Sequence, residues 1–357
     1  MATPAIPGSP QCPFYVTANF ANAVAMDAPP KPRNSRWDRA PVLDSNGRQK
    51  RALLTDRDIE ILKLLARYRY LPIDDIHGFV GGSRKGLAHH VNLLSREPNL
   101  YLRRPPQQRE SADANHRPLI YELDRRGRVV LQERGLPVSV GAYHHNFAHE
   151  LMACRIIAAF ELATIADPSL RFIAWDEIIA NPKTPQTIYN SPTGTRIPIS
   201  FTVGAKQHSM EICADGKPFG IEYHRPGEAP VYRFFPGVEA DTGTEPLQAS
   251  DIERSSIFKK LLAYLAIERD LTYRSHLGLP NLFVPFVTRT DSRMRSMMGL
   301  LEGLTEGRGS MTILFKTFTP HAAYTPRDHM LAQPWQRAGF SLLSLHGRTS
   351  TDWKHSP

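Results

Sequence analysis

The apolar residues between positions 54 and 94 fall into three short blocks, and within each block they recur every three or four residues. This spacing places the apolar side chains of a block on one face of a helix. The three stripes are Ile59, Leu62, Leu65 and Ala66; Ile73, Ile76 and Phe79; and Leu87, Val91 and Leu94. Thr55, followed by Asp58, and Ser83 are typical helix N-caps, and Pro72 is typical of a first helical turn. The segment therefore predicts three consecutive short helices.

Two strand-like segments follow, at 100–104 and 119–123, with a polar loop between them and a further helix from Asp124 to about Gly135. Three helices followed by a two-stranded hairpin predict a winged helix-turn-helix over residues 52–137. In such a domain the third helix is shaped for the major groove of DNA, and the hairpin reaches the backbone or the minor groove. Two alternatives stay open, because winged helices also dock proteins and because the same elements can form a plain core.

The DNA-binding side chains expected on this domain are polar residues that lie away from the apolar stripe or on the hairpin. On the third helix they are Arg84, Lys85, His89 and Asn92, and on the hairpin they are Arg103, Arg104, Arg109 and Arg117. We expect base-edge contacts from Arg84 and Lys85 in the first turn of the helix, and phosphate contacts from the hairpin arginines.

The net charge of +9 is concentrated in one part of the chain. Residues 31–145 hold 22 Lys and Arg against 13 Asp and Glu, whereas residues 146–357 hold 22 against 21. A local basic excess is typical of a polyanion partner, most often nucleic acid, although a charge bias that aids solubility is the alternative. Residues 1–51 are expected to be a disordered basic arm, which either tracks phosphates or is simply a solvated tail.

Composition excludes several classes of protein. No run of about 18 apolar residues is present, so we expect no membrane partner. The first 30 residues contain neither Lys or Arg nor a continuous apolar segment, so we expect no secretion signal there. The three cysteines are far apart and include no C-x-x-C pair, which favours a reducing cytoplasm over a disulfide framework. The sequence contains no P-loop, no G-x-G-x-x-G and no G-x-S-x-G motif, so it does not support a nucleotide-driven motor or a serine hydrolase.

Beyond residue 143 the pattern changes to alternating helices and strands, which predicts an α/β domain with a mixed sheet over residues 144–346. A helix is expected from Phe147 to Leu162, a strand from Arg171 to Trp175, a Pro- and Thr-rich insertion at 180–200 and a short tail at 347–357. The whole chain is thus expected to be α+β or α/β.

Several motifs, in this order, resemble the replication-relaxation family of plasmid and mobile-element proteins. They are Leu54–Asp58, His149–Leu151, Asp215-Gly216, Glu239–Glu245 before a helix with Lys259, Lys260 and Tyr264, Val287-Thr288, and Trp335 to Leu345. The resemblance covers about residues 52–346 and departs from the family in the basic arm and the 180–200 insertion. It implies an accessory role in plasmid replication or in assembly of a DNA-relaxation complex.

The second domain also resembles the restriction-endonuclease fold, in which an acidic residue at one strand end and an E-x-K on the next strand face one cleft. The resemblance implies Asp215 and Glu239 as carboxylates for Mg²⁺, because hard oxygens suit that ion. Asp241 stands where the motif lysine is expected, so Lys259 or Lys260 would have to replace it, and Glu150 would complete the site. The alternatives are an ordinary Asp-Gly turn, a solvated acidic loop, or a nuclease fold without activity.

His145 and His149 are four residues apart and could bind a transition metal, but a capped helix start is the favoured interpretation. Three functions remain from the sequence. The first is an accessory protein that binds double-stranded DNA, with replication or mobilisation proteins or a second copy as partners and no cofactor. The second is a Mg²⁺-dependent endonuclease that uses Glu150, Asp215, Glu239 and Lys260. The third is an adaptor that binds proteins and no DNA.

Overall fold

The computed structural model describes residues 36–110, 114–136, 138, 146–185, 188, 196–251, 254–318 and 329–347. The chain divides into two compact units, Met1–Asp38 and Arg39–Pro357. Within the first unit, the guanidinium of Arg36 lies over the ring of Trp37, 5.1 Å from its centroid. Three expected segments lie wholly or partly outside the described residues. They are the arm up to residue 35, the tail from residue 348, and residues 186–187 and 189–195 of the insertion. The elements described below all belong to the second unit.

The first elements form a helical module, a name used here for residues 54–136. Its elements in order are α1 (Asp56–Tyr68), β1 (Leu71–Pro72), α2 (Ile73–Val80), α3 (Arg84–Leu94), β2 (Leu102–Arg103), the 3-10 helix η1 (Pro106–Arg109), β3 (Ile120–Leu123) and α4 (Arg125–Glu133). The strands pair antiparallel in the order β1-β3-β2.

The helix starts expected in this module are confirmed where side-chain caps define them. Thr55 and Asp58 form a reciprocal capping box at α1, and the Ser83 hydroxyl accepts from the backbone of Gly86 at α3. One expectation was wrong in detail: Leu71 and Pro72 form a short strand paired with β3, and α2 begins only at Ile73. Proline tolerates this position because β1 lies at the edge of its sheet, where a missing N–H is harmless.

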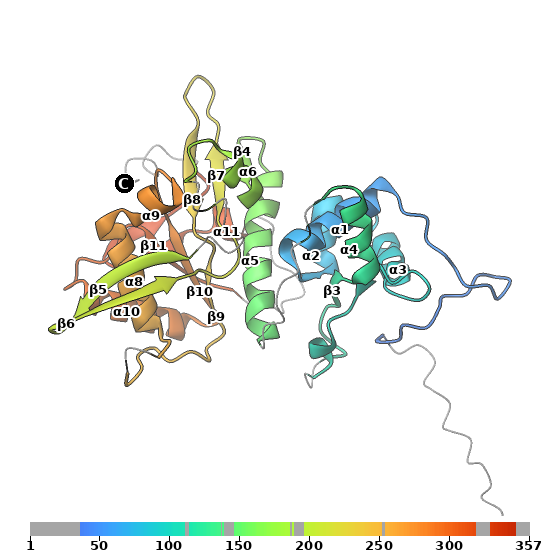
Figure 1. Ribbon diagram of the computed structural model, residues 1–357, viewed down its shortest axis with the longest axis horizontal. Coiled ribbons are helices and arrows are strands. Elements are labelled where there is room, and N and C mark those ends of the chain that lie inside the picture. Colours follow the sequence, from blue (N-terminus) through green and yellow to red (C-terminus); the bar gives the residue numbers. More distant parts are fainter. Residues whose placement is uncertain are drawn as a thin grey trace, which may run out of the picture. The chain divides into compact units, whose positions relative to one another are not determined.

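The rest of the described chain contains helices, one mixed sheet and two antiparallel ones (Figure 1). The helices are α5 (Phe147–Ile165), α6 (Trp175–Ala180), α8 (Ile257–Asp270), α9 (Thr272–Leu277), α10 (Asp291–Leu304) and α11 (His329–Ala332). The strands are β4 (Leu170–Ile173), β5 (Ile197–Val203), β6 (Lys206–Ile212), β7 (Phe219–Tyr223), β8 (Val231–Phe235), β9 (Glu239–Asp241), β10 (Val284–Thr288), β11 (Ile313–Thr317), β12 (Trp335–Arg337) and β13 (Phe340–Leu343).

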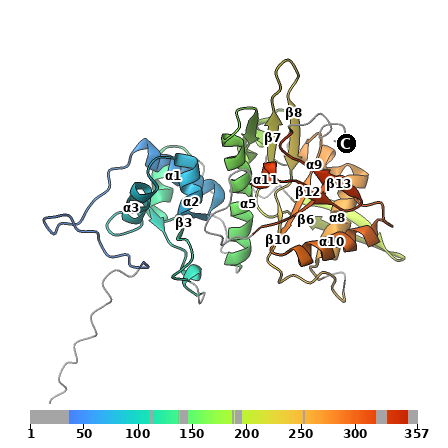
Figure 2. The same ribbon diagram turned by 180° about the vertical axis from the view of Figure 1, so that it is seen from behind.

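These strands form three groups. Strands β4, β7 and β8 are an antiparallel sheet. Strands β9, β10 and β11 are parallel, with β12 and β13 added antiparallel at one edge. Figure 2 labels β10, β12 and β13 from behind. Strands β5 and β6 form a separate hairpin. The described part of the chain contains no helix that is long and apolar enough to cross a membrane.

Three expectations for this part need correction. Trp175 begins α6 instead of ending a strand, and β5 begins at Ile197, inside the expected insertion. Strand β5 forms because Ile197, Ile199 and Phe201 alternate and are buried against α8 and α9. Residues 239–241, for which a solvated loop was one expectation, are a fully buried parallel strand next to β10.

The two largest parts of the core lie on opposite faces of the β9–β11 strands. Ala240 and Val287 belong to the part that includes α5 and α11, whereas Phe286 belongs to the part that includes α8 and α10. Side chains alternate along a strand, and Glu239 is directly opposite Phe286 in register. Glu239 therefore points towards α8, and this alternation determines which helix can supply its partners.

Helix α5 joins the helical module to the sheets through buried charges. The Arg155 guanidinium on α5 donates to Asp75 on α2, with Nε 2.8 Å from Oδ2, and only 4% of its side chain is exposed. Burial raises the pKa of Asp75, and the charge of Arg155 opposes that shift. On the same helix Glu161 accepts from Arg67 and from the Tyr68 hydroxyl of α1.

We expect Asp75→Ala to lower the free energy of unfolding by about 3–5 kcal/mol, because it leaves the Arg155 charge buried without its partner. The neighbouring Asp74 is the matched control, since its partner Arg84 is exposed, and Asp74→Ala should change stability by only about 0–1 kcal/mol. Chemical denaturation measures both. Equal losses for the two variants would mean that the Arg155–Asp75 pair contributes no more than a surface ion pair.

Candidate functional site

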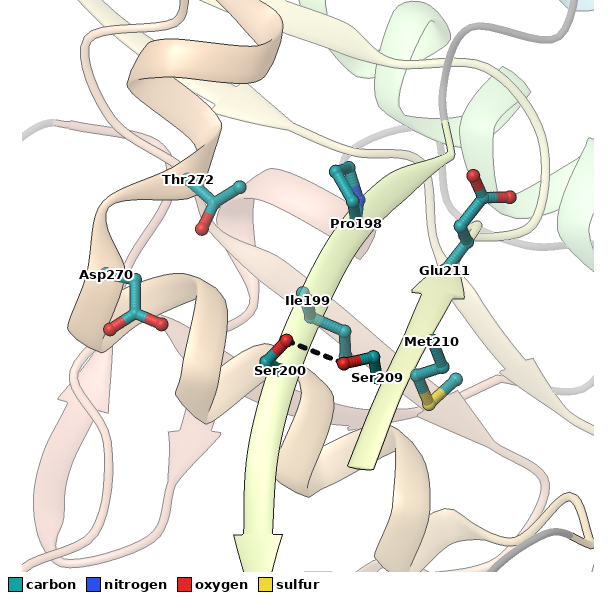
Figure 3. A pocket seen from close by; sticks show the side chains of 8 residues that line it. All are labelled: Pro198, Ile199, Ser200, Ser209, Met210, Glu211, Asp270 and Thr272. Atoms are coloured by element: carbon teal, nitrogen blue, oxygen red, sulfur yellow. Dashed lines mark hydrogen bonds between the residues drawn. The ribbon is translucent and has the colours of Figure 1, made fainter. Parts of the chain in front are cut away.

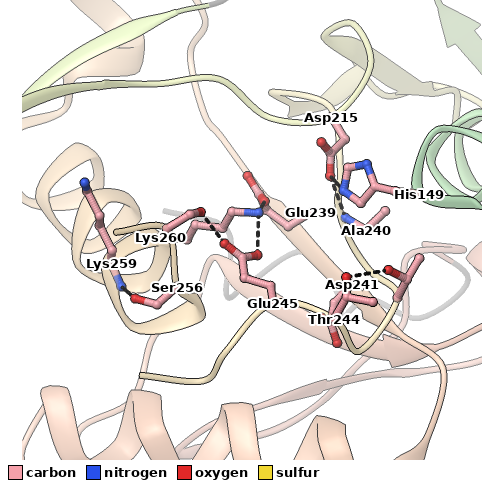
Figure 4. Close-up of polar contacts among 12 residues, drawn as sticks. His149, Asp215, Glu239, Ala240, Asp241, Thr244, Glu245, Ser256, Lys259 and Lys260 are labelled. Carbon is pink, nitrogen blue, oxygen red and sulfur yellow. Dashed lines mark hydrogen bonds and ion pairs between the residues drawn. The ribbon is translucent and has the colours of Figure 1, made fainter. Parts of the chain in front are cut away.

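Asp215 and Glu239, far apart in the sequence, meet at the start of β9 (Figure 4). Asp215 precedes β7 and pairs with Val238, with its N–H 2.7 Å from the Val238 carbonyl and its carbonyl 2.9 Å from the Val238 N–H. Its Oδ2 also accepts from the backbone N–H of Ala240 at 2.9 Å. The side chain of Asp215 is therefore held against β9, one residue from Glu239.

Helix α8 supplies two partners for Glu239. The Lys260 ammonium lies 2.8 Å from Oε2 of Glu239, and the Tyr264 hydroxyl donates to Oε1 at 2.5 Å. Lys260 and Tyr264 are four residues apart and share one face of the helix. The lysine also lies 3.0 Å from Oε2 of Glu245. Of the two lysines that the sequence left open, Lys260 therefore points into the cluster, whereas Lys259 points away from it in Figure 4.

The charges of this cluster shift one another. Burial raises the pKa of Glu239, and Lys260 opposes that shift. Burial alone would lower the pKa of Lys260, but the charges of Glu239, Asp215 and Glu245 outweigh it and raise the pKa overall. Lys260 therefore keeps its positive charge at neutral pH, and this charge is what makes a buried carboxylate at position 239 tolerable.

His149 is a member of the cluster that the sequence did not place there. Its Nε2 lies 3.1 Å from Oδ2 of Asp215. The contact with Asp215 raises the pKa of His149, and burial acts against that shift. The capped helix start is confirmed, because the Asn146 side chain accepts from the backbone of His149 at 3.2 Å. His145, its partner in the expected metal pair, lies outside the described residues.

Two further acidic residues lie elsewhere. Asp241, at the position of the motif lysine, accepts from the Thr288 hydroxyl at 2.7 Å and from Nε of Arg293 at 3.0 Å, and is buried on the α10 side. Glu150, which was expected to complete the site, lies 2.9 Å from Arg69 of the helical module. Consecutive residues of a helix point about 100° apart, so α5 cannot direct both His149 and Glu150 at the cluster.

The donor set is compatible with a divalent metal bound through two carboxylates. Among the residues that the structure describes, no group of three or more His, Cys, Asp or Glu is placed to hold a metal ion. Mg²⁺, however, commonly uses only one or two protein carboxylates together with water and substrate phosphate. Asp215 and Lys260 are 20% and 22% exposed at their side chains, so one edge of the cluster is open to solvent. Asp215 and Glu239 are the residues that would hold the ion.

The expected DNA-binding residues on α3 separate into two groups. Arg84, Lys85 and His89 are exposed on the helix, and Arg84 donates to Asp74 at 2.5 Å. Asn92 instead lies half-buried and accepts hydrogen bonds from Arg96 and Arg104. The exposed surface of α3 is therefore its first two turns.

The hairpin arginines are also divided. Arg104 is buried, 9% exposed, and lies over the ring of Tyr121, so burial lowers its pKa. Its position inside the module differs from the phosphate contact expected of it. Arg103 pairs with Glu122 at 2.9 Å. Arg109 ends η1, and Arg117 lies in the loop between η1 and β3.

A surface hollow of about 530 Å³ lies apart from these groups (Figure 3). It is bounded by the β5–β6 hairpin and by Asp270 and Thr272 at the junction of α8 and α9, and Ser200 and Ser209 share a hydrogen bond across the hairpin at 3.0 Å. None of the residues expected at a site lines it.

Comparison of the chain with protein-family models, with curated proteins and with solved structures found no match. The resemblance to the replication-relaxation family therefore stays a prediction, and function has to be inferred from the geometry of this chain.

The contact between His149 and Asp215 predicts a pH dependence of stability. Because the folded-state pKa of His149 is raised, the contact stabilises fully below the unfolded value, about 6.5, and its contribution disappears as pH rises through the folded pKa. Between about pH 6 and 8, the wild type should lose more stability than Asp215→Asn. NMR titration of the His149 ring and denaturation across this range provide the measurement, with His149→Gln expected to match Asp215→Asn. An unchanged pKa of His149 in Asp215→Asn would contradict the assignment.

Proposed function

We propose that this chain binds double-stranded DNA and hydrolyses its phosphodiester backbone with Mg²⁺ at Asp215, Glu239 and Lys260. The observation that carries the proposal is the position of Lys260, whose ammonium lies 2.8 Å from Glu239. A nuclease site of this type needs a lysine beside its carboxylates, and Asp241 leaves the usual motif position without one. In this proposal Lys260, from the following helix, would take the role of that lysine.

Each residue has a role that its chemistry supports. Asp215 and Glu239 would hold Mg²⁺, which would supply Lewis-acid stabilisation of the phosphate and an activated water. Lys260 stays protonated, so its charge would stabilise the negative charge that develops on the phosphate during attack. The contact of His149 with Asp215 would keep that carboxylate in position, and the hydrogen bond from Tyr264 would do the same for Glu239.

The order of elements and the exposed part of α3 are consistent with this proposal. From α5 the chain continues through β4, α6, the β5–β6 hairpin, β7 and β8 to β9 and then α8. Asp215 lies in the turn between β6 and β7, Glu239 is the first residue of β9, and Lys260 lies on the next helix, α8. In the helical module, Arg84, Lys85 and His89 are exposed on α3, the helix that follows α2 after a turn of three residues. We propose that this exposed part of α3 enters the major groove.

A second candidate is an accessory DNA-binding protein with an inactive cluster, acting in replication control or in assembly of a DNA-processing complex of a mobile element. The observation that favours it is the burial of Glu239, which is 2% exposed and has both oxygens contacted by Tyr264 and Lys260. A carboxylate so fully engaged has to exchange Lys260 for a metal ion before it can act. The two candidates share DNA binding and differ only in strand cleavage.

Cleavage of end-labelled duplex DNA in Mg²⁺, with an EDTA arm, tests the first candidate. Glu239→Gln and Lys260→Ala should each reduce the cleavage rate by about 10²–10³-fold, because each removes a group that stabilises the transition state. Lys259→Ala is the matched control, since Lys259 is adjacent in sequence and points away from the cluster, and it should cut like the wild type.

DNA affinity measured on the same samples separates the candidates. Glu239→Gln should bind DNA as tightly as the wild type. A wild type that shifts DNA but leaves it intact under every metal condition would exclude hydrolysis and favour the accessory role. Absence of any shift at low salt would overturn both and favour the adaptor.

Arg84→Ala with Lys85→Ala should weaken binding to a selected duplex by about 1–3 kcal/mol for each base-reading side chain removed, and should weaken binding to random duplex less. Lys206→Ala, at the exposed start of β6, is the control and should change neither affinity. Fluorescence anisotropy on both duplexes is the measurement. Equal weakening on selected and random DNA would reassign the start of α3 to backbone binding.

A further inference from the structure

Residues 39–51, expected to belong to a disordered arm, form a hairpin whose two ends lie together. Leu43 pairs with Gln49, the Lys50 N–H donates to Val42 at 2.7 Å, and the Asp44 N–H donates to Arg48 at 2.8 Å. Asp44 also accepts from the backbone N–H groups of residues 46 and 48, which closes the tip. The segment is a folded projection of the second unit.

The base of this hairpin is fastened to the loop between α3 and β2. Asn99 in that loop is buried, with its Oδ1 accepting from Ala52 at 2.8 Å and its Nδ2 donating to the Lys50 carbonyl at 3.2 Å. The Glu97 N–H donates to the Arg39 carbonyl at 2.9 Å, so both ends of the hairpin are held at one place. These contacts are local to the C-terminal end of α3.

The first turn of helix α4 contacts the same loop. The Arg126 guanidinium donates to the Pro98 carbonyl and lies over the ring of Tyr101, 5.0 Å from its centroid. Asp124, the N-cap of α4, pairs with Arg39 of the hairpin at 2.5 Å. The hairpin and the first turn of α4 therefore both contact the 96–101 loop, and the Arg39–Asp124 pair joins them directly.

The exposed side chains of this region are mainly basic. We name them the second basic surface, and its members are Arg39, Arg48, Lys50, Arg51, Arg125 and Arg126. Of the nearby acids, Asp44 closes the hairpin tip, Asp124 caps α4 and pairs with Arg39, and Glu97 is exposed in the loop, so basic side chains outnumber acidic ones here. Helix α3 is 11 residues long, so at 1.5 Å per residue Arg84 lies roughly 15 Å along the axis from the C-terminal end, next to which this surface lies.

We propose that the second basic surface binds the phosphate backbone of the duplex that α3 reads, beyond the C-terminal end of that helix. It rests on the proposed DNA binding and is independent of cleavage. Arginine-rich surfaces suit phosphates, because the guanidinium donates two parallel hydrogen bonds to phosphate oxygens. The hairpin is fixed at its base, where Arg39, Lys50 and Arg51 lie, and Arg48 adjoins its tip. Such a fixed basic surface suits a groove edge or backbone better than a base pair. The surface adds affinity without adding sequence preference.

The test measures the salt dependence of binding for the full chain. The plot of log K against log salt concentration has a negative slope, and removing one phosphate-binding side chain reduces its magnitude by about 0.9. The combined variant Arg48→Ala, Lys50→Ala and Arg51→Ala should therefore reduce this magnitude by up to about 3. Affinity for selected and random duplexes should fall by the same factor, in contrast to the variants of Arg84 and Lys85. Arg125→Ala alone should reduce the magnitude of the slope by about 1.

The control removes three exposed basic residues elsewhere, with Lys206→Ala, Arg254→Ala and Arg295→Ala, and should leave the slope unchanged. If the wild type binds DNA, and the hairpin triple variant and Arg125→Ala both show the wild-type salt dependence, the inference is overturned. The proposed DNA binding would then remain intact. A wild type that binds no duplex would overturn the DNA binding itself. Arg125→Ala keeps the test decisive if the triple variant fails to fold, because Arg125 lies outside the hairpin.

Discussion

The buried pair between Arg155 and Asp75 is the constraint on which the arrangement of this chain depends. The Arg155 side chain is 4% exposed and that of Asp75 is 14% exposed, so loss of either partner would leave the other charge largely buried and uncompensated. The same helix carries His149 at its start, where it contacts Asp215. Helix α5 thus contacts the helical module through Arg155 and contacts Asp215 of the acidic cluster through His149 in its first turn.

A second consequence of burial is that the groups proposed for catalysis at the start of β9 are the same groups that stabilise the fold there. Glu239 faces α8 because side chains alternate along the strand, and in that position it needs the charge of Lys260 and the hydroxyl of Tyr264. The same contacts that make burial of Glu239 tolerable thus bring a carboxylate, an ammonium and a hydroxyl together at one strand end.

Local patterns predicted the helices well and the long-range contacts poorly. The caps Thr55 and Ser83 could be predicted from the sequence, because N-caps depend on residues three positions apart. Strand β9 could not, since three buried residues carry no period. The contact of His149 with Asp215, and the choice of Lys260 over Lys259, depend on how α5 and α8 are rotated against the sheet, which no local pattern contains.

The most direct test of the account is whether the cluster binds a divalent metal. Electron paramagnetic resonance of Mn²⁺ titrated into the full chain, with and without a phosphorothioate duplex that resists cleavage, measures this. The account predicts that the wild type and Lys259→Ala bind Mn²⁺ and that Asp215→Asn and Glu239→Gln do not. A wild type that binds no Mn²⁺ even with duplex present, or binding that survives in Asp215→Asn, would contradict it.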